Sequence, residues 1–159
     1  MAERFYPFKT AAEGMAAGFT LVETVVVVII IGLLLSISIP DLQEAMSRYR
    51  LNTAASLLAS DIRFVQQISR ERETESSIVF VPEQNMYVLY AGDEALEARA
   101  LPANVSLHST TFASNTLQFG ASTEPGKAAG SGEIRLQSRN YSFSVTVQVS
   151  APSGEVVVR

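Results

Sequence analysis

The side chains that could carry acid–base, nucleophilic or metal chemistry are few in this sequence and form no recognisable constellation. His108 is the only histidine, and cysteine is absent, which excludes disulfides, thiolate zinc sites and thiol catalysis. Asp93, Glu94 and Glu97 follow one another in a predicted turn and its flank, with too few clustered oxygen ligands for a calcium site. No phosphate-binding glycine loop and no G-x-S-x-G motif occurs. We therefore expect no enzyme, no cofactor and no metal.

Glu23 is the titratable residue with the most unusual surroundings. It interrupts an otherwise uncharged apolar run from Phe19 to Ile39. As a helix this run would be about 31 Å long, close to the hydrocarbon thickness of a bilayer. A carboxylate in such a segment costs about 2.5–3.5 kcal/mol on membrane-insertion scales and usually has a function. The sequence thus predicts a membrane-compatible helix with one functional carboxylate.

Two simple explanations of the apolar run account for only part of it. A secretory signal peptide has a shorter apolar core, a positive leading region and a small-residue cleavage site. Here Arg4 and Lys9 are balanced by Glu3 and Glu13, and no such cleavage site follows the run. A plain membrane anchor explains the length of the run but not Glu23.

A third explanation accounts for both the length and the charge. The order of residues resembles the processing motif of type IV pilins and type II secretion pseudopilins, here Gly18-Phe19-Thr20-Leu21-Val22-Glu23. The resemblance implies that a prepilin peptidase cleaves between Gly18 and Phe19 and that Phe19 is then N-methylated. The sequence departs from the family at Ala17, where Lys or Arg is common. The resemblance also implies assembly with other pilin or pseudopilin subunits.

The physics of burial gives Glu23 a role in that assembly. The new amine at Phe19 would be cationic and Glu23 anionic, and burying either alone in an apolar filament core is costly. We expect Glu23 to pair with the amine of a neighbouring subunit. Pro40 stands where such pilins often carry a helix-kinking proline, and we expect a kink or local melting near residues 36–40.

Beyond Pro40 the pattern predicts one amphipathic helix from Asp41 to Arg72 whose apolar stripe lies on a sheet. Its expected apolar positions are Leu42, Met46, Tyr49, Ala54, Leu57, Leu58, Ile62, Val65 and Ile68. Polar residues fall between them, among them Arg48, Arg50, Asp61, Arg63 and Gln67.

The remainder of the chain predicts short strands separated by turns. The expected strands are Ser77–Val81, Met86–Tyr90, Val105–Ser109, Thr116–Phe119, Glu133–Gln137, Tyr141–Ser150 and Glu155–Arg159. Residues 120–132 are small and polar and predict a surface loop. The fold class is therefore α+β, with a long N-terminal helix packed on a C-terminal antiparallel β head.

We divide the chain by role. The expected parts are a leader peptide (1–18), a transmembrane and filament-core helix (19–39), an amphipathic helix that continues into the head (40–72) and a β-rich globular head (73–159). The head pattern is most similar to the minor pseudopilin H and minor pilin T group, and the lack of a C-terminal disulfide favours a minor subunit or pseudopilin. The expected location is the bacterial inner membrane, crossed once, with the head in the periplasm or outside, assembled in a pilus or pseudopilus.

The function that follows is structural, in a type II secretion pseudopilus or a type IV pilus. The alternative is a DNA-binding minor pilin acting in natural transformation, as some members of the resembled group are. Its candidate contacts are Arg135, Arg139 and Arg159. Against it stand a net charge of −4 and Glu155 beside the last turn. We therefore expect no nucleic-acid partner.

Overall fold

The distribution of apolar residues divides the molecule into two units. The structure, a computed structural model, describes residues 19–120 and 124–159. The chain separates between Ile39 and Pro40 into a first unit, of which residues 19–39 are described, and a second unit formed by residues 40–159. One helix, α1 (Leu21–Arg72), contributes to both. We call the second unit the head.

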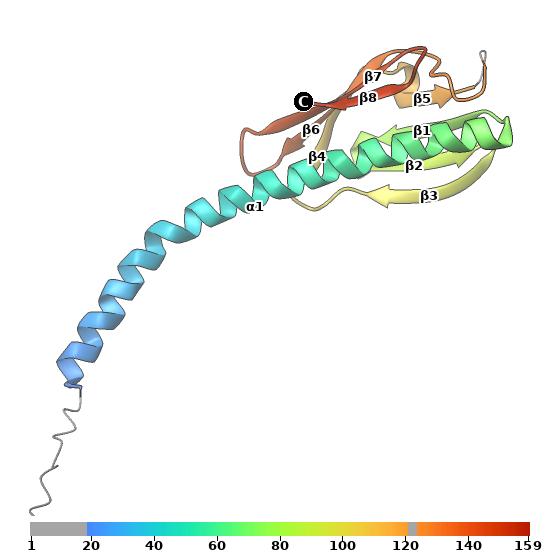
Figure 1. Ribbon diagram of the computed structural model, residues 1–159. Coiled ribbons are helices and arrows are strands. Elements are labelled where there is room, and N and C mark those ends of the chain that lie inside the picture. The colour runs from blue at the N-terminus through green and yellow to red at the C-terminus, as the bar shows by residue number, and fades with distance from the viewer. Residues whose placement is uncertain (1–18, 121–123) are drawn as a thin grey trace, which may run out of the picture. The chain divides into compact units, whose positions relative to one another are not determined.

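The described residues of the head form eight strands in two antiparallel sheets (Figure 1). The first sheet has the order β3-β2-β1-β5 and the second β4-β6-β7-β8. The strands are β1 (Ser76–Val81), β2 (Met86–Ala91), β3 (Glu94–Ala100), β4 (Val105–Thr110), β5 (Thr116–Phe119), β6 (Gly132–Ser138), β7 (Ser144–Ser150) and β8 (Glu155–Val158). Two short 3₁₀ turns, η1 (Pro82–Gln84) and η2 (Ala113–Asn115), precede β2 and β5. The α+β class is confirmed.

The core of the head lies between α1 and the two sheets. From the helix it takes Leu51, Ala54, Ala55, Leu58, Ala59, Ile62 and Val65, and from the sheets residues such as Ile78, Phe80, Leu89, Leu117, Ile134 and Val147. Alternate strand residues point inward, as in the buried–intermediate alternation of β1. Because residues of the helix and of both sheets share this core, the amphipathic helix lies on a sheet as predicted.

The predicted position of the apolar stripe was partly wrong. Leu42, Met46, Tyr49 and Leu57 are exposed, whereas Leu51, Ala55 and Ala59 are buried. Five predicted positions are buried as expected, and the true stripe mixes large and small side chains. The five are Ala54, Leu58, Ile62, Val65 and Ile68. Asp61, assigned to the polar face, is buried with a relative exposure of 5%.

Two features of the strands also differ from expectation. Strand β3, with the sequence EALEARA, was missed because its composition has low β propensity. It is tolerated as a strand because it lies at the edge of its sheet, where charged side chains reach water. Strand β7 begins at Ser144, not Tyr141, because Arg139–Phe143 form the connection from β6.

Two polar side chains of α1 attach the loops to the core. Gln66 on α1 donates from Nε2 to the carbonyl oxygens of Gly126 (2.9 Å) and Ser153 (2.8 Å). Gly154, with φ +69°, lies against the same amide, and a Cβ there would approach Gln66 Nε2 to 2.4 Å. Ser69 on the next turn accepts from the Gly126 N–H at 3.2 Å.

Asn85 connects the two sheets. Its backbone is left-handed, with φ 54° and ψ 44°, which asparagine tolerates better than most residues. Its side-chain Nδ2 donates to the Val105 carbonyl (2.7 Å), and its Oδ1 accepts from the Leu107 N–H (2.8 Å). The amide thus completes the edge of β4 as a neighbouring strand would.

Candidate functional site: an uncovered apolar helix

The predicted processing site lies at the start of the described chain. Gly18 and the leader 1–18 lie outside the described residues, so cleavage stays a prediction. Phe19 is described and is 80% exposed. A side chain so exposed and so apolar is unusual beside a helix start, and it suits a residue that will lie in lipid or against another subunit.

Thr20, a residue of the processing motif, caps the start of the helix. The backbone N–H of Glu23 donates to Thr20 Oγ1 at 3.2 Å. Thr followed three residues later by Glu is the capping-box spacing, and a carboxylate in the first turn interacts favourably with the helix dipole. The contact observed is that of the Glu23 backbone, so the cap assigns a local structural role to Thr20, and the Glu23 carboxylate lies in the first turn of the helix.

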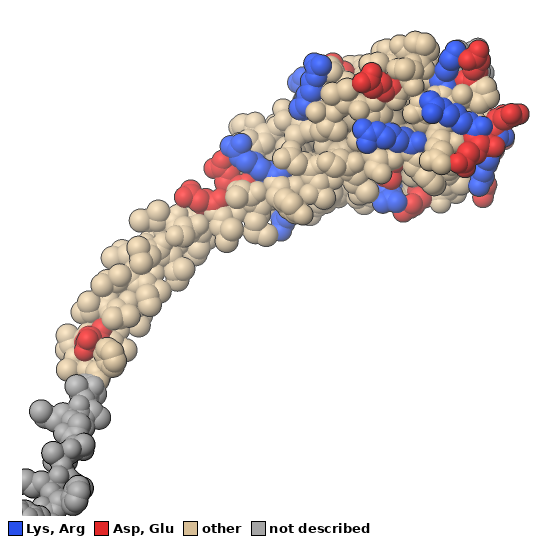
Figure 2. Space-filling model, in the orientation of Figure 1, with Lys and Arg blue, Asp and Glu red and all other residues tan. Residues whose placement is uncertain are grey.

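Among the described residues of its unit, nothing covers the helix from Leu21 to Ile39. Every large apolar residue in this stretch is exposed, from Leu21 at 79% to Ile39 at 49%. The most apolar stretch of α1 has a mean hydropathy of 2.7 and none of it is buried, so the helix is long and apolar enough to cross a membrane. Figure 2 shows this surface as almost entirely uncharged.

The hydroxyl groups in this stretch are satisfied within the helix itself. Ser36 Oγ donates to the Leu33 carbonyl at 2.7 Å, and Ser38 Oγ donates to the Leu34 carbonyl at 3.0 Å. Such bonds leave no side-chain donor in need of water, as a lipid-exposed helix requires. The segment is compatible with single-pass membrane anchoring.

Pro40 does not interrupt the helix. Of the kink or local melting expected near residues 36–40, the melting is wrong, because α1 is helical throughout Leu21–Arg72 with Pro40 inside it, whereas the kink stays a prediction. A single proline removes one backbone donor and crowds the preceding turn. Here the turns on both sides remain helical, so the apolar and amphipathic segments belong to one continuous helix.

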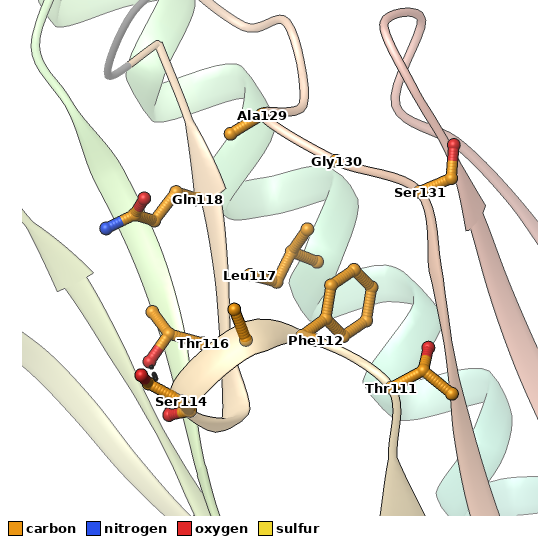
Figure 3. Close-up of a pocket in the computed structure, with 10 residues that line it drawn as sticks. Thr111, Phe112, Ser114, Thr116, Leu117, Gln118, Ala129, Gly130 and Ser131 are labelled. Atoms are coloured by element: carbon orange, nitrogen blue, oxygen red, sulfur yellow. Dashed lines mark hydrogen bonds between the residues drawn. The ribbon is translucent and has the colours of Figure 1, made fainter.

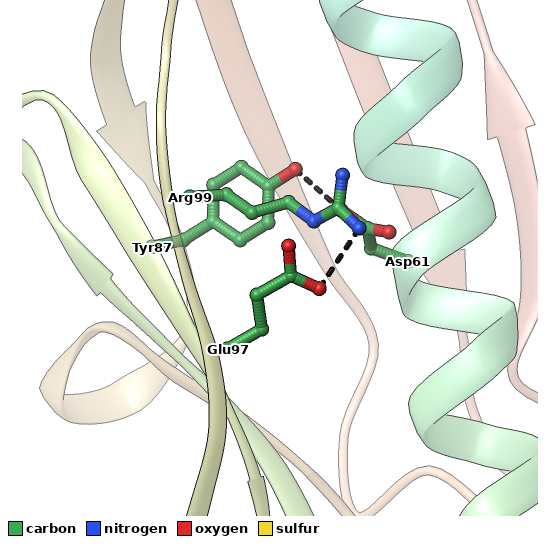
Figure 4. A network of polar contacts seen from close by, with 4 residues as sticks. All are labelled: Asp61, Tyr87, Glu97 and Arg99. Atoms are coloured by element: carbon green, nitrogen blue, oxygen red, sulfur yellow. Dashed lines mark hydrogen bonds and ion pairs between the residues drawn. The ribbon is translucent and has the colours of Figure 1, made fainter.

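A buried polar network in the head was not foreseen (Figure 4). Tyr87 on β2 donates its hydroxyl to Asp61 Oδ2 at 2.6 Å. Arg99 on β3 places Nε 3.2 Å from the same oxygen, an ion-pair contact without hydrogen-bond alignment, and donates from Nη2 to Glu97 at 2.9 Å. Burial, reinforced by the Asp61 carboxylate, raises the pKa of Tyr87 far above its usual range. The network ties α1 to the first sheet.

The cavity in Figure 3 lies where the two sheets diverge. It has a volume of about 370 Å³ and is lined by neutral residues, including Thr111, Phe112, Ser114, Leu117 and Gln118. Among the described residues that line it, none is acidic, basic or otherwise charged. Within residues 19–120 and 124–159 no three His, Cys, Asp or Glu side chains are grouped to hold a metal ion. The expectations of no enzyme and no metal stay predictions.

The candidate acidic and imidazole residues lie apart on the surface. His108 is exposed on β4, where the register with β6 shifts between Leu107 and Ser109. Asp93 lies in the β2–β3 turn, and Glu97 belongs to the network already described.

The candidate nucleic-acid contacts are only partly brought together. Arg135 on β6 pairs with Thr146 on β7, and the backbone of Arg159 bonds to Thr146 from the other side at 2.8 and 2.9 Å. Arg135 and Arg159 are therefore aligned across the second sheet. Arg139 lies instead in the β6–β7 connection. Glu133 occurs two residues before Arg135 on the same face and accepts from Gln148, which adds negative charge to the row.

The architecture is that of a pilin-like protein: one long apolar helix that continues into an antiparallel β head. No family model and no solved structure matches the chain. Among curated proteins, it is 30% identical over 141 residues to the competence protein ComGD of Bacillus subtilis (strain 168), covering 89% of this chain and 92% of that protein. The chain belongs to the type IV pilin-like family of that competence protein.

Proposed function

We propose that this protein is a structural subunit of a pilus-like filament that serves competence. A prepilin peptidase removes residues 1–18, Phe19 is N-methylated, and the apolar helix holds the subunit in the membrane until it enters the filament. The observation that carries the proposal is the uncovered helix from Leu21 to Ile39 with Glu23 as its single carboxylate.

Energetics favour assembly over a free subunit. Burying one Val, Leu or Ile side chain contributes about 1.5–3 kcal/mol, and the segment consists mainly of such residues. Lipid or the helices of other pilin subunits can supply the cover. Lipid leaves the Glu23 carboxylate unpaired, whereas a neighbouring subunit can present the amine of its own Phe19. This difference makes the free energy of the helix lower in the filament than in the membrane.

The similarity to a competence protein favours competence over the type II secretion pseudopilus or other type IV pilus expected at first. Membership of the minor pseudopilin H or minor pilin T group stays a prediction. So does the orientation of the head, which we place on the outer side of the cell membrane.

Glu23→Gln tests the proposal, because glutamine keeps the capping-box spacing and removes only the charge. In the native host we expect membrane retention to be unchanged, and both filament incorporation and transformation to fall at least tenfold. The readouts are the amount of subunit in sheared filament fractions and the number of transformants. Glu71→Gln, an exposed carboxylate at the far end of the same helix, is the matched control.

Processing is tested separately by mass spectrometry of the N-terminus of protein purified from that host. The expected mature chain begins at methylated Phe19. A chain that retains residues 1–18 beside an active peptidase, or a Glu23→Gln variant that assembles as the wild type does, contradicts the proposal.

Direct DNA capture by this subunit is the second candidate, supported by the alignment of Arg135 with Arg159. Two cations on phosphates give a salt slope of only about −2, too weak for capture alone. A gel-shift titration of the purified protein at two salt concentrations distinguishes the candidates. Sub-micromolar binding that is lost in an Arg135→Gln, Arg159→Gln double variant would favour DNA capture.

A further inference from the structure

A small cavity in the head lies between α1 and two of the loops that join the strands. It has a volume of about 170 Å³, and the β6–β7 connection meets the helix there (Figure 1). All of its lining residues belong to the second unit, so the cavity does not depend on where the apolar part of the helix lies. We call it the amide cavity. Its polar lining residues are Gln43, Ser47, Arg50, Asn104, Asn140 and Tyr141.

The two loops that line the amide cavity are held in place by main-chain bonds. The Ser138 N–H donates to the Phe143 carbonyl at 2.9 Å and closes the β6–β7 connection. The Arg139 N–H donates to the Asn104 carbonyl, also at 2.9 Å, and joins this connection to the β3–β4 loop. Tyr141 stacks on Phe143 with ring centroids 5.6 Å apart. The lining side chains are therefore positioned in advance, which lowers the entropic cost of binding a ligand.

Ser47 is the residue that points to a ligand. It is 5% exposed and lines the cavity, yet its hydroxyl has no hydrogen-bond partner among the residues that the structure describes. Ser36 and Ser38 of the same helix instead donate to carbonyl oxygens of the preceding turn. A buried hydroxyl without a partner costs free energy. A polar group that enters the cavity and bonds to Ser47 removes that cost.

The other polar side chains of the amide cavity are also available to a ligand. None of them makes a side-chain hydrogen bond or an ion pair within residues 19–120 and 124–159. Amides and hydroxyls both donate and accept, whereas the guanidinium of Arg50 only donates. No described lining residue is acidic, so a cationic ligand finds no counter-charge. This set of groups matches a neutral ligand with several hydroxyls, each of which also donates and accepts.

Tyr141 adds an aromatic surface to these polar groups. Phe143 stacks on one side of the ring, and the ring also lines the cavity. C–H groups carry a small positive charge and pack well on the negative face of an aromatic ring. The cavity is smaller than the range of about 300–1,000 Å³ that is usual for drug-sized ligands, so it suits a single ring. A sugar ring combines hydroxyls at its edge with C–H groups on its faces.

We propose that the amide cavity binds one hexose ring of a glycan. A C–H face of the sugar lies on Tyr141, its hydroxyls bond to Ser47 and to the surrounding amides, and Arg50 donates to a sugar oxygen. The head thereby gains an affinity for carbohydrate. This activity goes beyond the proposed function, because it requires neither the membrane anchor nor assembly into a filament.

Saturation-transfer NMR on the purified full chain tests the site, in micelles of a detergent that has no sugar headgroup. The probes are methyl β-glucoside, methyl β-galactoside and N-acetylglucosamine, each added singly. We expect magnetisation to pass from the protein to at least one of these sugars. The expected dissociation constant is about 1–10 mM, as suits a ligand of about a dozen non-hydrogen atoms.

Two substitutions should weaken binding through different contacts. Tyr141→Ala removes the aromatic surface, and we expect the affinity to fall about tenfold. Asn140→Ala removes one amide at an exposed position, where the fold does not depend on it, and we expect a fall of about three- to tenfold. Tyr49→Ala is the matched control, because Tyr49 is 73% exposed on α1 and does not line the cavity. Its affinity should equal that of the wild type.

Ser47→Ala separates a binding role from a structural one. The change removes the unpartnered hydroxyl, so the free chain should be at least as stable as the wild type in urea, while the affinity for the sugar should fall about three- to tenfold. Circular dichroism checks the folding of every variant. A Ser47→Ala variant that binds the sugar as the wild type does contradicts the proposal.

Three further results overturn the sugar site. The first is no transfer to any of the three sugars, and the second is an equal loss of affinity in Tyr49→Ala and Asn140→Ala, which places binding elsewhere. The third is a response to inorganic phosphate but to no sugar, which assigns the cavity to an anion at Arg50. Because the purified chain is not assembled, these results leave the proposed function untouched. A Glu23→Gln variant that assembles normally likewise leaves the sugar site untouched.

Discussion

The two parts of α1 show how one helix can satisfy opposite requirements. From Leu21 to Ile39 its apolar side chains are exposed all round, and its hydroxyls are bonded back to its own carbonyls. From Leu51 onward it buries a stripe of small and medium side chains and adds buried polar groups, Asp61 and Gln66, that reach the sheets. The first part can be covered only by lipid or by other subunits. The second has its partners built into the same chain.

This difference predicts that equal substitutions in the two parts will have unequal effects on folding. Within the head, buried positions of α1 should control the free energy of unfolding. In the apolar part, the same changes should alter membrane retention and assembly and leave head stability unchanged. The following variants, unfolded by urea in mild detergent, test the contrast from the largest expected effect to the smallest.

The largest effect is expected from Leu58→Ala. Leu58 has a relative exposure of 0%, so truncation removes buried apolar contacts and leaves a cavity. We expect a loss of about 3–4 kcal/mol. Leu57→Ala is the matched control, because Leu57 is the adjacent residue and is 44% exposed. A loss at Leu57 as large as that at Leu58 would mean that the helix faces the sheets with another side.

Asp61→Ala should come next. The change leaves the Tyr87 hydroxyl and the Arg99 guanidinium without their shared acceptor in a largely buried site. Because Arg99 remains partly exposed and can be solvated, we expect a moderate loss of about 2–3 kcal/mol. Glu97→Ala, which removes the more exposed carboxylate of the same network, should cost under about 1 kcal/mol. Similar losses for both would contradict a central role for Asp61.

The sequence contained the pattern for most of the fold but only part of the facing of the helix. Alternation identified seven of the strands approximately, because half-buried antiparallel strands carry that pattern directly. The apolar stripe was placed only in part, because large apolar side chains such as Leu57 and Phe64 also occur on the exposed face of the helix. Size and polarity alone therefore did not separate the two faces, although Leu58, Ile62 and Val65 are buried as expected.

The polar parts of the head could not have been predicted from sequence alone. Asp61 follows the spacing of a solvated face, and only the tertiary position of Tyr87 and Arg99 shows that it is buried. Strand β3 resembles a helical segment in composition and is a strand because β2 has a free edge beside it. By contrast, the apolar run and the Glu23 position are local patterns, and they identified the candidate site directly.

Asn85→Ala should have a smaller effect than either change in the core. It removes two hydrogen bonds to the edge of β4 and places a residue less tolerant of φ 54° at this position. We expect a loss of about 1–2 kcal/mol. Asn85→Gly should recover part of it, since glycine restores the backbone conformation but not the bonds. An Asn85→Ala variant as stable as the wild type would show that the sheets are joined by the core alone.

The smallest effect on unfolding is expected from Ile30→Ala, paired with Ile62→Ala as its counterpart in the head. Both substitutions remove the same atoms from the same helix, but Ile30 is 50% exposed and Ile62 is 0% exposed. Ile62→Ala should cost about 2–4 kcal/mol, whereas Ile30→Ala should change the free energy of unfolding by less than about 0.5 kcal/mol. In lipid, Ile30→Ala removes apolar surface that no part of the chain covers, so its effect should instead appear as weaker flotation with vesicles. If Ile30→Ala destabilises the head as much as Ile62→Ala does, the two units fold together. The apolar part of α1 would then contribute to the stability of the head, and the division of the helix into two parts would be wrong.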